Sequence, residues 1–263
     1  MKKDTAFNLI LLSTLTVIIL FLLILIFSVV GYINWNKAAG IFLSREILFA
    51  IKLSLITSTV SSVLAMALAV PAALALSRLE FFGKSVVDTL IDLPIIISPV
   101  ALGAVLLVFL NNTSLGRFIE RNIFEFTFEV SGIILAQFIV ILALAIRLLK
   151  STFDGIDTRY ENVIRTLGAT RSKAVFFVTL PMAKQGIFAA FVLTWTRAIG
   201  EFGATVTLAG AAKMKTETLP VAIFLSLAGA DVQRAMVIIL ILFFIAVLVL
   251  FAVRSIGKRG LYY

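Results

Sequence analysis

Two charged side chains interrupt the apolar run of residues 185–210, and they are the first candidates for chemistry in this chain. Arg197 and Glu201 are four residues apart, so their side chains can pair along one face of a helix. Charges at membrane depth are costly, and they face a protein interior, a partner charge or a water-filled path. In the structural interpretation the pair holds neighbouring helices together, and the small residues Gly200 and Gly203 let the backbones approach.

The sequence lacks most of the side chains that catalyse reactions or bind metals. The sequence contains no Cys and no His, which removes thiol nucleophiles, imidazole bases and nearly every zinc site. Gly83-Lys84-Ser85 looks like the end of a phosphate-binding loop, but the full pattern requires a glycine where this chain has Arg78. We therefore expect no metal site, no cofactor in this chain and no ATP hydrolysis by it.

A pair of acids and a pair of prolines mark the third apolar run. Asp88 and Asp92 precede Pro94, where carboxylates complement the positive end of a helix dipole, and we favour this interpretation. A proton relay is the alternative. The chain has no His, however, and Glu201 is the one other acid well inside an apolar run, so a relay would have few groups to carry the proton. Pro94 and Pro99 are expected to bend the helix and to free backbone carbonyls that line a pathway.

The composition is that of an integral membrane protein. Of 263 residues, 61% are hydrophobic and 14% are charged, and the mean hydropathy is +1.13. This apolar surface exceeds what one soluble core can bury. We expect an all-α membrane protein with six transmembrane helices in a single domain over residues 1–263, because six runs reach the roughly 20 residues needed to cross a bilayer. The runs are 8–30, 48–77, 89–110, 130–149, 185–210 and 234–254.

The placement of cations predicts the orientation. Six spans put both termini on one side, and with the N-terminus inside the internal segments are 1–7, 78–88, 150–184 and 255–263. These segments and the adjoining helix ends hold most of the 23 Lys and Arg residues. The positive-inside rule therefore predicts cytoplasmic N- and C-termini in the cell membrane. The net charge of +9 is explained by this placement beside lipid, and we expect no nucleic acid partner.

The polar stretch of residues 150–184 has a helical pattern of its own. Asp157 is available as an N-cap and Gly168 as a terminator. A second helical piece, 171–179, is expected to stop at Leu180-Pro181, because proline cannot donate the next backbone hydrogen bond. The pattern fits a helix on anionic lipid and a helix docked on a protein equally well. Its apolar positions are Ile156, Tyr160, Val163 or Ile164, and Leu167.

A resemblance favours docking on a protein. The segment Asp157-Thr-Arg-Tyr-Glu-Asn-Val-Ile-Arg-Thr-Leu-Gly-Ala169, followed by Leu180-Pro181, resembles the EAA loop of ATP-binding-cassette importer permeases. In that family the loop forms the coupling helix, which sits in a cleft of the ATPase subunit. The Glu-Ala-Ala positions are Asn162-Val-Ile164 here, with a glutamate immediately upstream. The resemblance assigns ATPase docking to Asp157, Arg159, Glu161, Asn162, Arg165, Gly168 and Ala169.

A second segment narrows the resemblance to a subfamily. Residues 194–210, Thr-Trp-Thr-Arg-Ala-Ile-Gly-Glu-Phe-Gly-Ala-Thr-Val-Thr-Leu-Ala-Gly, resemble a segment of molybdate and tungstate permeases, and less closely one of sulfate permeases. Supporting pieces are residues 93–100 and 217–224, and the resemblance covers most of 46–255. The functional alternative for the charged pair makes Arg197 an electrostatic stepping stone for a tetrahedral dianion, with Glu201 keeping the anion from binding too tightly. We favour the structural interpretation, because conduction requires weak binding and a permease fed by a receptor needs no tight site of its own. The translocation-path candidates are Arg197, Gly200, Glu201, Gly203, Pro94 and Pro99.

The resemblance implies a type I importer permease that moves molybdate or tungstate across the cell membrane by alternating access. The implied partners are two ATPase subunits that bind ATP and Mg, a second permease copy, an extracytoplasmic substrate-binding protein and membrane lipid. One alternative is a sulfate importer permease. Another, from a different class, is an ion-coupled secondary transporter or channel, which should show embedded titratable groups or broken helices in symmetric positions.

Overall fold

The computed structural model describes the backbone of residues 2–259 and the side chains of 7–249 and 251. Met1 and residues 260–263, at the ends of the two terminal segments expected inside, lie outside this part of the chain. The described residues form α-helices α1 to α13 and one π-helical turn, η1, with no strand among them. The prediction of an all-α protein is confirmed.

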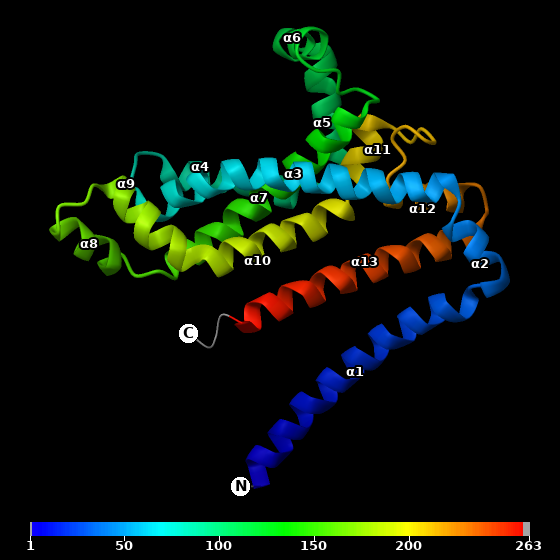
Figure 1. The fold of residues 1–263 in the computed structure, drawn as a ribbon, viewed down its shortest axis with the longest axis horizontal. Helices are drawn as coiled ribbons and strands as arrows, with labels where there is room; N and C mark the ends of the chain where they lie inside the picture. The colour runs from blue at the N-terminus through cyan, green and yellow to red at the C-terminus, as the bar shows by residue number, and fades with distance from the viewer. Residues whose placement is uncertain (1, 260–263) are drawn as a thin grey trace.

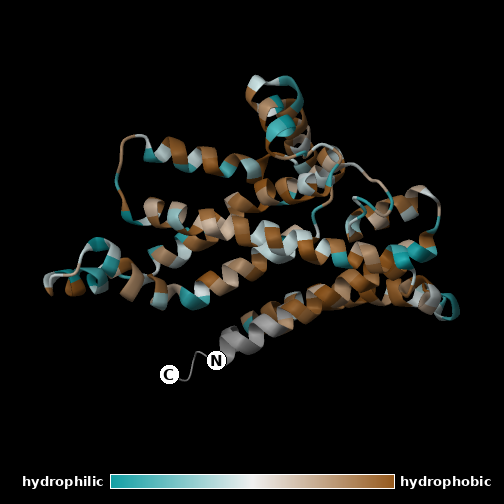
Figure 2. Cartoon of the chain, turned by 45° about the horizontal axis from the view of Figure 1, so that its top comes forward, coloured by the Kyte–Doolittle hydropathy of each residue, from teal (hydrophilic) through white to brown (hydrophobic). Residues whose placement is uncertain are grey.

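Five helical stretches are long and apolar enough to cross a membrane. A sixth span is a bent pair of helices, α4 (Lys84–Ile96) and α5 (Pro99–Asn112), whose axes differ by 109°. Figure 2 shows the apolar residues along the spans and hydrophilic residues in the loops at their ends. The expectation of six spans is thus met if the bent pair counts as one. The five stretches are α1 (Lys2–Tyr32), α3 (Arg45–Arg78), α7 (Val130–Asp154), Arg171–Ile199 and α13 (Val232–Arg259).

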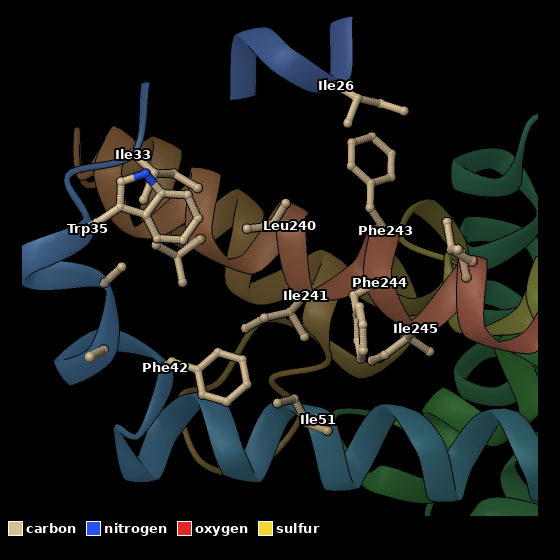
Figure 3. Close-up of a pocket in the computed structure, with 15 residues that line it drawn as sticks. Ile26, Ile33, Trp35, Phe42, Ile51, Leu240, Ile241, Phe243, Phe244 and Ile245 are labelled. Atoms are coloured by element: carbon tan, nitrogen blue, oxygen red, sulfur yellow. The ribbon is translucent and has the colours of Figure 1, made fainter. Parts of the chain in front are cut away.

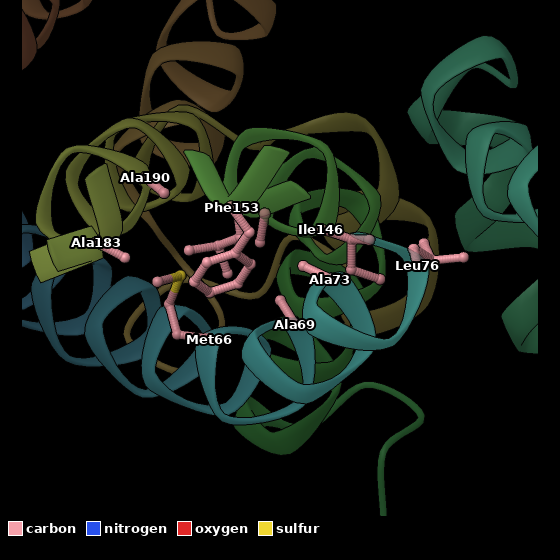
Figure 4. Packing of buried hydrophobic residues seen from close by; sticks show 10 residues of the cluster. Met66, Ala69, Ala73, Leu76, Ile146, Phe153, Ala183 and Ala190 are labelled. Atoms are coloured by element: carbon pink, nitrogen blue, oxygen red, sulfur yellow. The ribbon is translucent and has the colours of Figure 1, made fainter. Parts of the chain in front are cut away.

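Helices α3, α7 and α10 (Leu180–Ile199) form the centre of the bundle. Small residues of α3 let it approach its neighbours closely. In Figure 4, Met66 and Ala69 of α3 lie with Phe153 of α7 and Ala183 of α10 in one buried cluster. Phe153 is fully buried, and its aromatic ring fills the space that the alanines leave.

Two ends of the bundle can be distinguished in Figure 1. One carries the short helices α8 (Arg159–Thr166) and α9 (Arg171–Ala174), together with the end of α3 and the start of α4. The opposite end carries α2 (Trp35–Phe42) and α12 (Leu219–Ala228). The terminal ends of α1 and α13 are both directed toward the end with α8. The segments 78–88 and 150–184 lie at this same end of the bundle.

The expectation that Leu180-Pro181 stops a helix is wrong. The helix continues from α9 through η1 (Val175–Thr179) into α10. In this wider π turn the Leu180 N–H bonds to the Val175 carbonyl, five residues back. Pro181 then falls in the first turn of α10, where a missing N–H is tolerated.

Helix α1 stands away from the bundle (Figure 1), and its apolar stretch has no buried side chains. An apolar cavity of about 1090 Å³ lies between α1, α2 and α13. Figure 3 shows Ile26 of α1, Trp35 and Phe42 of α2, and Phe243 and Phe244 of α13 around it. Within this chain α1 therefore has few packing partners, and its side chains remain available to lipid or to another subunit.

Candidate translocation path and docking loop

One of the six spans, α4 with α5, is broken, and its break meets a second interruption, where α10 ends and a short helix follows. The first break, at Ile97–Ser98, lies between Pro94 and Pro99, where the Ser98 hydroxyl accepts a hydrogen bond from the Ala101 N–H. The second separates α10 from α11 (Gly203–Ala209). The predicted bend at the prolines is confirmed, but the single helix expected over 185–210 ends at Ile199.

Glycines bring the two breaks into contact. A Cβ added at Gly203 would lie 2.9 Å from Val100 Cγ2 and 3.2 Å from Pro99 Cβ. A Cβ added at Gly103 would lie 2.8 Å from the Ala204 carbonyl oxygen. Helices α5 and α11 therefore pack backbone to backbone, which only glycine at both positions allows.

Arg197 and Glu201 lie at the second break and pair as their spacing predicts. Arg197 Nη1 is 2.6 Å from Glu201 Oε2. The Glu201 side chain is 1% exposed, whereas that of Arg197 is 38% exposed. Glu201 Oε1 also accepts a hydrogen bond of 3.0 Å from the Ala204 N–H in the first turn of α11. Glu201 thus stabilises the broken helix, while Arg197 presents its guanidinium to open space beside it.

Sequence reasoning missed a buried polar brace at this break. Gln137 Nε2 of α7 donates to the Ala198 carbonyl at 3.1 Å, and Ser61 of α3 donates to Gln137 Oε1 at 3.0 Å. Both side chains are buried. The Ala198 carbonyl also accepts the Glu201 N–H at 3.0 Å, so the brace adds a second, side-chain donor at the end of α10 and ties α10 to α7 and α3. Its sequence signal is a lone Gln inside the apolar run 130–149, on a chain where Ser and Thr also recur along α3.

Five of the six path candidates gather at the junction of the two breaks. Pro99 and Gly203 are in contact, and Arg197, Gly200 and Glu201 border the second break. Pro94 lies inside α4, one turn before the first break.

The acids at the start of the third span do not cap a helix, so that prediction is wrong. Helix α4 begins at Lys84 and has no acid in its first turn. Instead both acids bind one arginine of α7: Arg147 Nη1 is 2.6 Å from Asp88 Oδ1, and Arg147 Nε is 2.5 Å from Asp92 Oδ1. Arg147 also donates to the Asp88 carbonyl. These ion pairs hold α4 against α7.

The loop between α7 and α9 contains the predicted short helix, α8. The N-cap position of α8 is Thr158, one residue after the predicted Asp157, but the Asp157 carboxylate accepts a hydrogen bond of 2.8 Å from the Arg159 N–H at the start of the helix. Gly168 ends it with φ of +88°, and the Ala169 N–H bonds to the Ile164 carbonyl. The stretch of residues 150–184 begins in the last turn of α7 and ends in the first turns of α10.

On α8 and at its end, most apolar side chains are exposed and one acid is buried. The apolar residues Tyr160, Val163 and Leu167 are 54%, 62% and 82% exposed, and only Ile164 is partly buried. The buried residue of α8 is Glu161, whose carboxylate lies 2.7 Å from Arg78 Nε of α3. The remaining docking candidates lie on the surface, with Ala169 half-buried: Asp157, Arg159, Asn162, Arg165, Gly168 and Ala169.

Among the described residues, no group of three or more acids could hold a metal ion. The site consists of an arginine where the broken span α4–α5 meets the end of α10, and of a small helix with exposed apolar side chains. Such a molecule is a multi-pass helical membrane protein with a candidate solute path and a candidate surface for a partner.

Comparison with known proteins identifies the family. The family model of the binding-protein-dependent transport system inner membrane component matches residues 62–259, so this chain belongs to that family. It is thus a membrane permease component and not a catalytic enzyme. The chain is 37% identical to a probable molybdenum ABC transporter permease protein of Haloferax volcanii over 82% of this chain and 78% of the relative.

Other relatives and a solved structure agree with this assignment. The molybdenum transport system permease protein ModB of Haemophilus influenzae is 34% identical over 71% of this chain and 83% of its own length. The sulfate transport system permease protein CysT of Salmonella typhimurium is 27% identical over 86% of this chain and 82% of its own. The crystal structure of a bacterial alginate ABC transporter aligns with a TM-score of 0.78 at 19% identity, covering 98% of this chain and 96% of that one. The type I permease fold is confirmed.

Proposed function

We propose that this chain is the permease of an importer for molybdate or tungstate. Arg197 is the observation that carries the proposal, because its partly exposed guanidinium lies where the broken span α4–α5 meets the end of α10. Broken helices at membrane depth line a cavity or are buried in protein, since lipid cannot satisfy their free backbone groups. Arg197 can attract a dianion at this place, and the neighbouring Glu201 carboxylate weakens that attraction. Weak binding suits a substrate that must bind and then leave.

Sulfate is the nearest alternative substrate, because it is also a tetrahedral dianion. The relatives named for molybdenum are more similar to this chain than the sulfate permease is. An ion-coupled secondary transporter was expected to show embedded titratable groups or broken helices in symmetric positions, and one span here is broken. The family match nevertheless supports a permease that depends on a binding protein and on separate ATPase subunits.

We propose that α8 docks in a cleft of the ATPase, with the end of the bundle that carries α8 in the cytoplasm. Its exposed apolar residues supply contact area, and the surface residues of the loop supply polar contacts around them. The docking residues we propose are Asp157, Arg159, Asn162, Arg165, Gly168 and Ala169, with Tyr160, Val163 and Leu167. Glu161 leaves this set because its carboxylate is bonded inside the chain.

The working assembly in this proposal contains two permease copies, two ATPase subunits and one extracytoplasmic binding protein. The unpacked helix α1 and the unfilled cavity beside it favour a second subunit and lipid as neighbours. ATP and Mg belong to the ATPase subunits. ATP-driven closure of these subunits brings the two α8 helices together and opens the path outward; hydrolysis returns it inward.

The test is ATP hydrolysis by the reconstituted assembly in the presence of binding protein loaded with molybdate, tungstate or sulfate. We expect molybdate and tungstate to stimulate hydrolysis and sulfate to have a smaller effect. A chain that binds no ATPase subunit would overturn the proposed function. Stimulation by sulfate alone would reassign the substrate and leave the transporter class intact.

A further inference from the structure

A buried ion pair joins the docking loop to the membrane-spanning helices. Arg78 is the last residue of α3, and its Nε lies 2.7 Å from Glu161 Oε1 on α8. The two side chains are only 7% and 8% exposed, although both lie at the end of the bundle, near solvent. Charges are rarely buried at such a place unless they are paired and hydrogen-bonded.

The pair is one part of a larger junction. The hydroxyl of Thr179 donates to the same Glu161 oxygen at 2.7 Å, and Thr179 is the last residue of the π turn η1. Arg78 Nη2 also donates to the Ile156 carbonyl at 2.9 Å, just ahead of α8. Three elements therefore meet at one carboxylate oxygen: the end of α3, the helix α8 and the base of α10.

A continuous helix connects this junction to the membrane-spanning part of the bundle. The helix runs without a break from Arg171 to Ile199, so Thr179 and Arg197 lie on one continuous element. Coupling between distant sites travels through such rigid elements and through polar networks with defined partners. The base of α10 is attached to α8 mainly through Glu161 and through the short helix α9 that precedes η1.

From this geometry, and resting on the proposed function, we propose that Arg78, Glu161 and Thr179 form a joint. The joint carries the movement of α8 to α3 and α10 when the ATPase subunits close. Glu161 is then a positioning residue, which acts through Arg78 and Thr179 and makes no contact with the ATPase. Glu161 lies next to Asn162-Val-Ile164, so its bonds to Arg78 and Thr179 fix the loop to the bundle beside the proposed docking surface.

The experiment measures the number of ATP molecules hydrolysed per molybdate imported by the reconstituted assembly. Thr179→Val removes the hydroxyl and keeps the shape, and Glu161→Gln removes the charge. We expect both to raise the ratio by about 2- to 30-fold, the range typical of residues in a coupling network, with unchanged ATPase co-purification. Thr179→Ser, which restores the donor, is expected to keep the wild-type ratio.

Glu80→Gln is the matched control, because Glu80 pairs with Lys84 at the same end of the bundle but is almost fully exposed. Wild-type ratios in both Thr179→Val and Glu161→Gln would overturn the joint. So would a loss of uptake that follows a loss of bound ATPase, since that result assigns the residues to docking or folding. If one variant does not reach the membrane, the other decides. A wild-type assembly that imports no oxyanion would overturn the proposed function itself, and the joint with it.

Discussion

In the proposed function, Arg197 and Glu201 have different roles, one in the path and one in the support of the helix end. Glu201 is buried and bonded to both Arg197 and the start of α11, so it supports the break in the helix. Arg197 is exposed enough to meet a passing anion. The spacing of the two residues predicted their pairing, but only the difference in exposure separates their roles.

Arg197→Gln is expected to lower stability and uptake together. It leaves the buried Glu201 carboxylate without its cation, at a cost on the order of 3 kcal/mol. The double variant Arg197→Gln/Glu201→Gln removes the stranded charge, and the new amide oxygen can still accept the Ala204 N–H. Thermal unfolding in detergent should return toward the wild-type temperature, while molybdate uptake stays low. Recovery of uptake in the double variant would make the pair purely structural.

Gly103→Ala tests the close contact of α5 with α11. The added Cβ would lie 2.8 Å from the Ala204 carbonyl oxygen, which is backbone and cannot rotate away. We expect a loss of about 1–3 kcal/mol in unfolding free energy and reduced uptake. Gly40→Ala in α2 is the control, because nothing lies within 4 Å of its added Cβ. Equal thermal stability in the two variants would contradict the contact.

The sequence predicts the elements of this protein better than their interruptions. Hydropathy alone located the spans, and capping chemistry located α8 between Asp157 and Gly168. The sequence does not predict the end of α10 at Ile199, because the apolar run continues to residue 210. Gln137, which bonds to the Ala198 carbonyl at this helix end, is far away in sequence. Pro181 does not end the helix as predicted, because a π turn, which depends on tertiary packing, accommodates it. The burial of Glu161 depends on Arg78, 83 residues earlier.

The end of α8 depends on one left-handed residue. Gly168→Val places a β-branched side chain at φ of +88°, which costs roughly 1–2 kcal/mol or more and unwinds the cap. We expect hydrolysis to become uncoupled from uptake. Gly168→Asn is the control, because Asn tolerates this conformation. Unchanged coupling in Gly168→Val would count against the role assigned to the loop.

The exposed face of α8 distinguishes docking on a protein from binding to lipid. Leu167 is 82% exposed, so Leu167→Asp should leave thermal stability unchanged. We expect it to reduce the amount of ATPase that co-purifies with the permease. Unaltered ATPase binding, combined with weaker association of the isolated segment with anionic vesicles, would favour the lipid interpretation instead.

At the scale of the whole molecule, the chain is one component of the assembly that we propose. The bundle holds the junction of the broken span α4–α5 with the end of α10, and it carries the proposed docking helix at one end; the continuous helix from Arg171 to Ile199 joins the two. Helix α1 and the cavity beside it are incompletely packed within one chain. These features are typical of a permease that works with a second copy and is driven by other subunits.

The most direct test of this account is the accumulation of molybdate in proteoliposomes that contain the permease with or without its ATPase subunits. We predict accumulation against a gradient only when ATPase, ATP and molybdate-loaded binding protein are all present. The ATPase must face the ATP, and an imposed proton or sodium gradient should have no effect. Accumulation by the permease alone, driven by such a gradient, would contradict the account and identify an ion-coupled transporter.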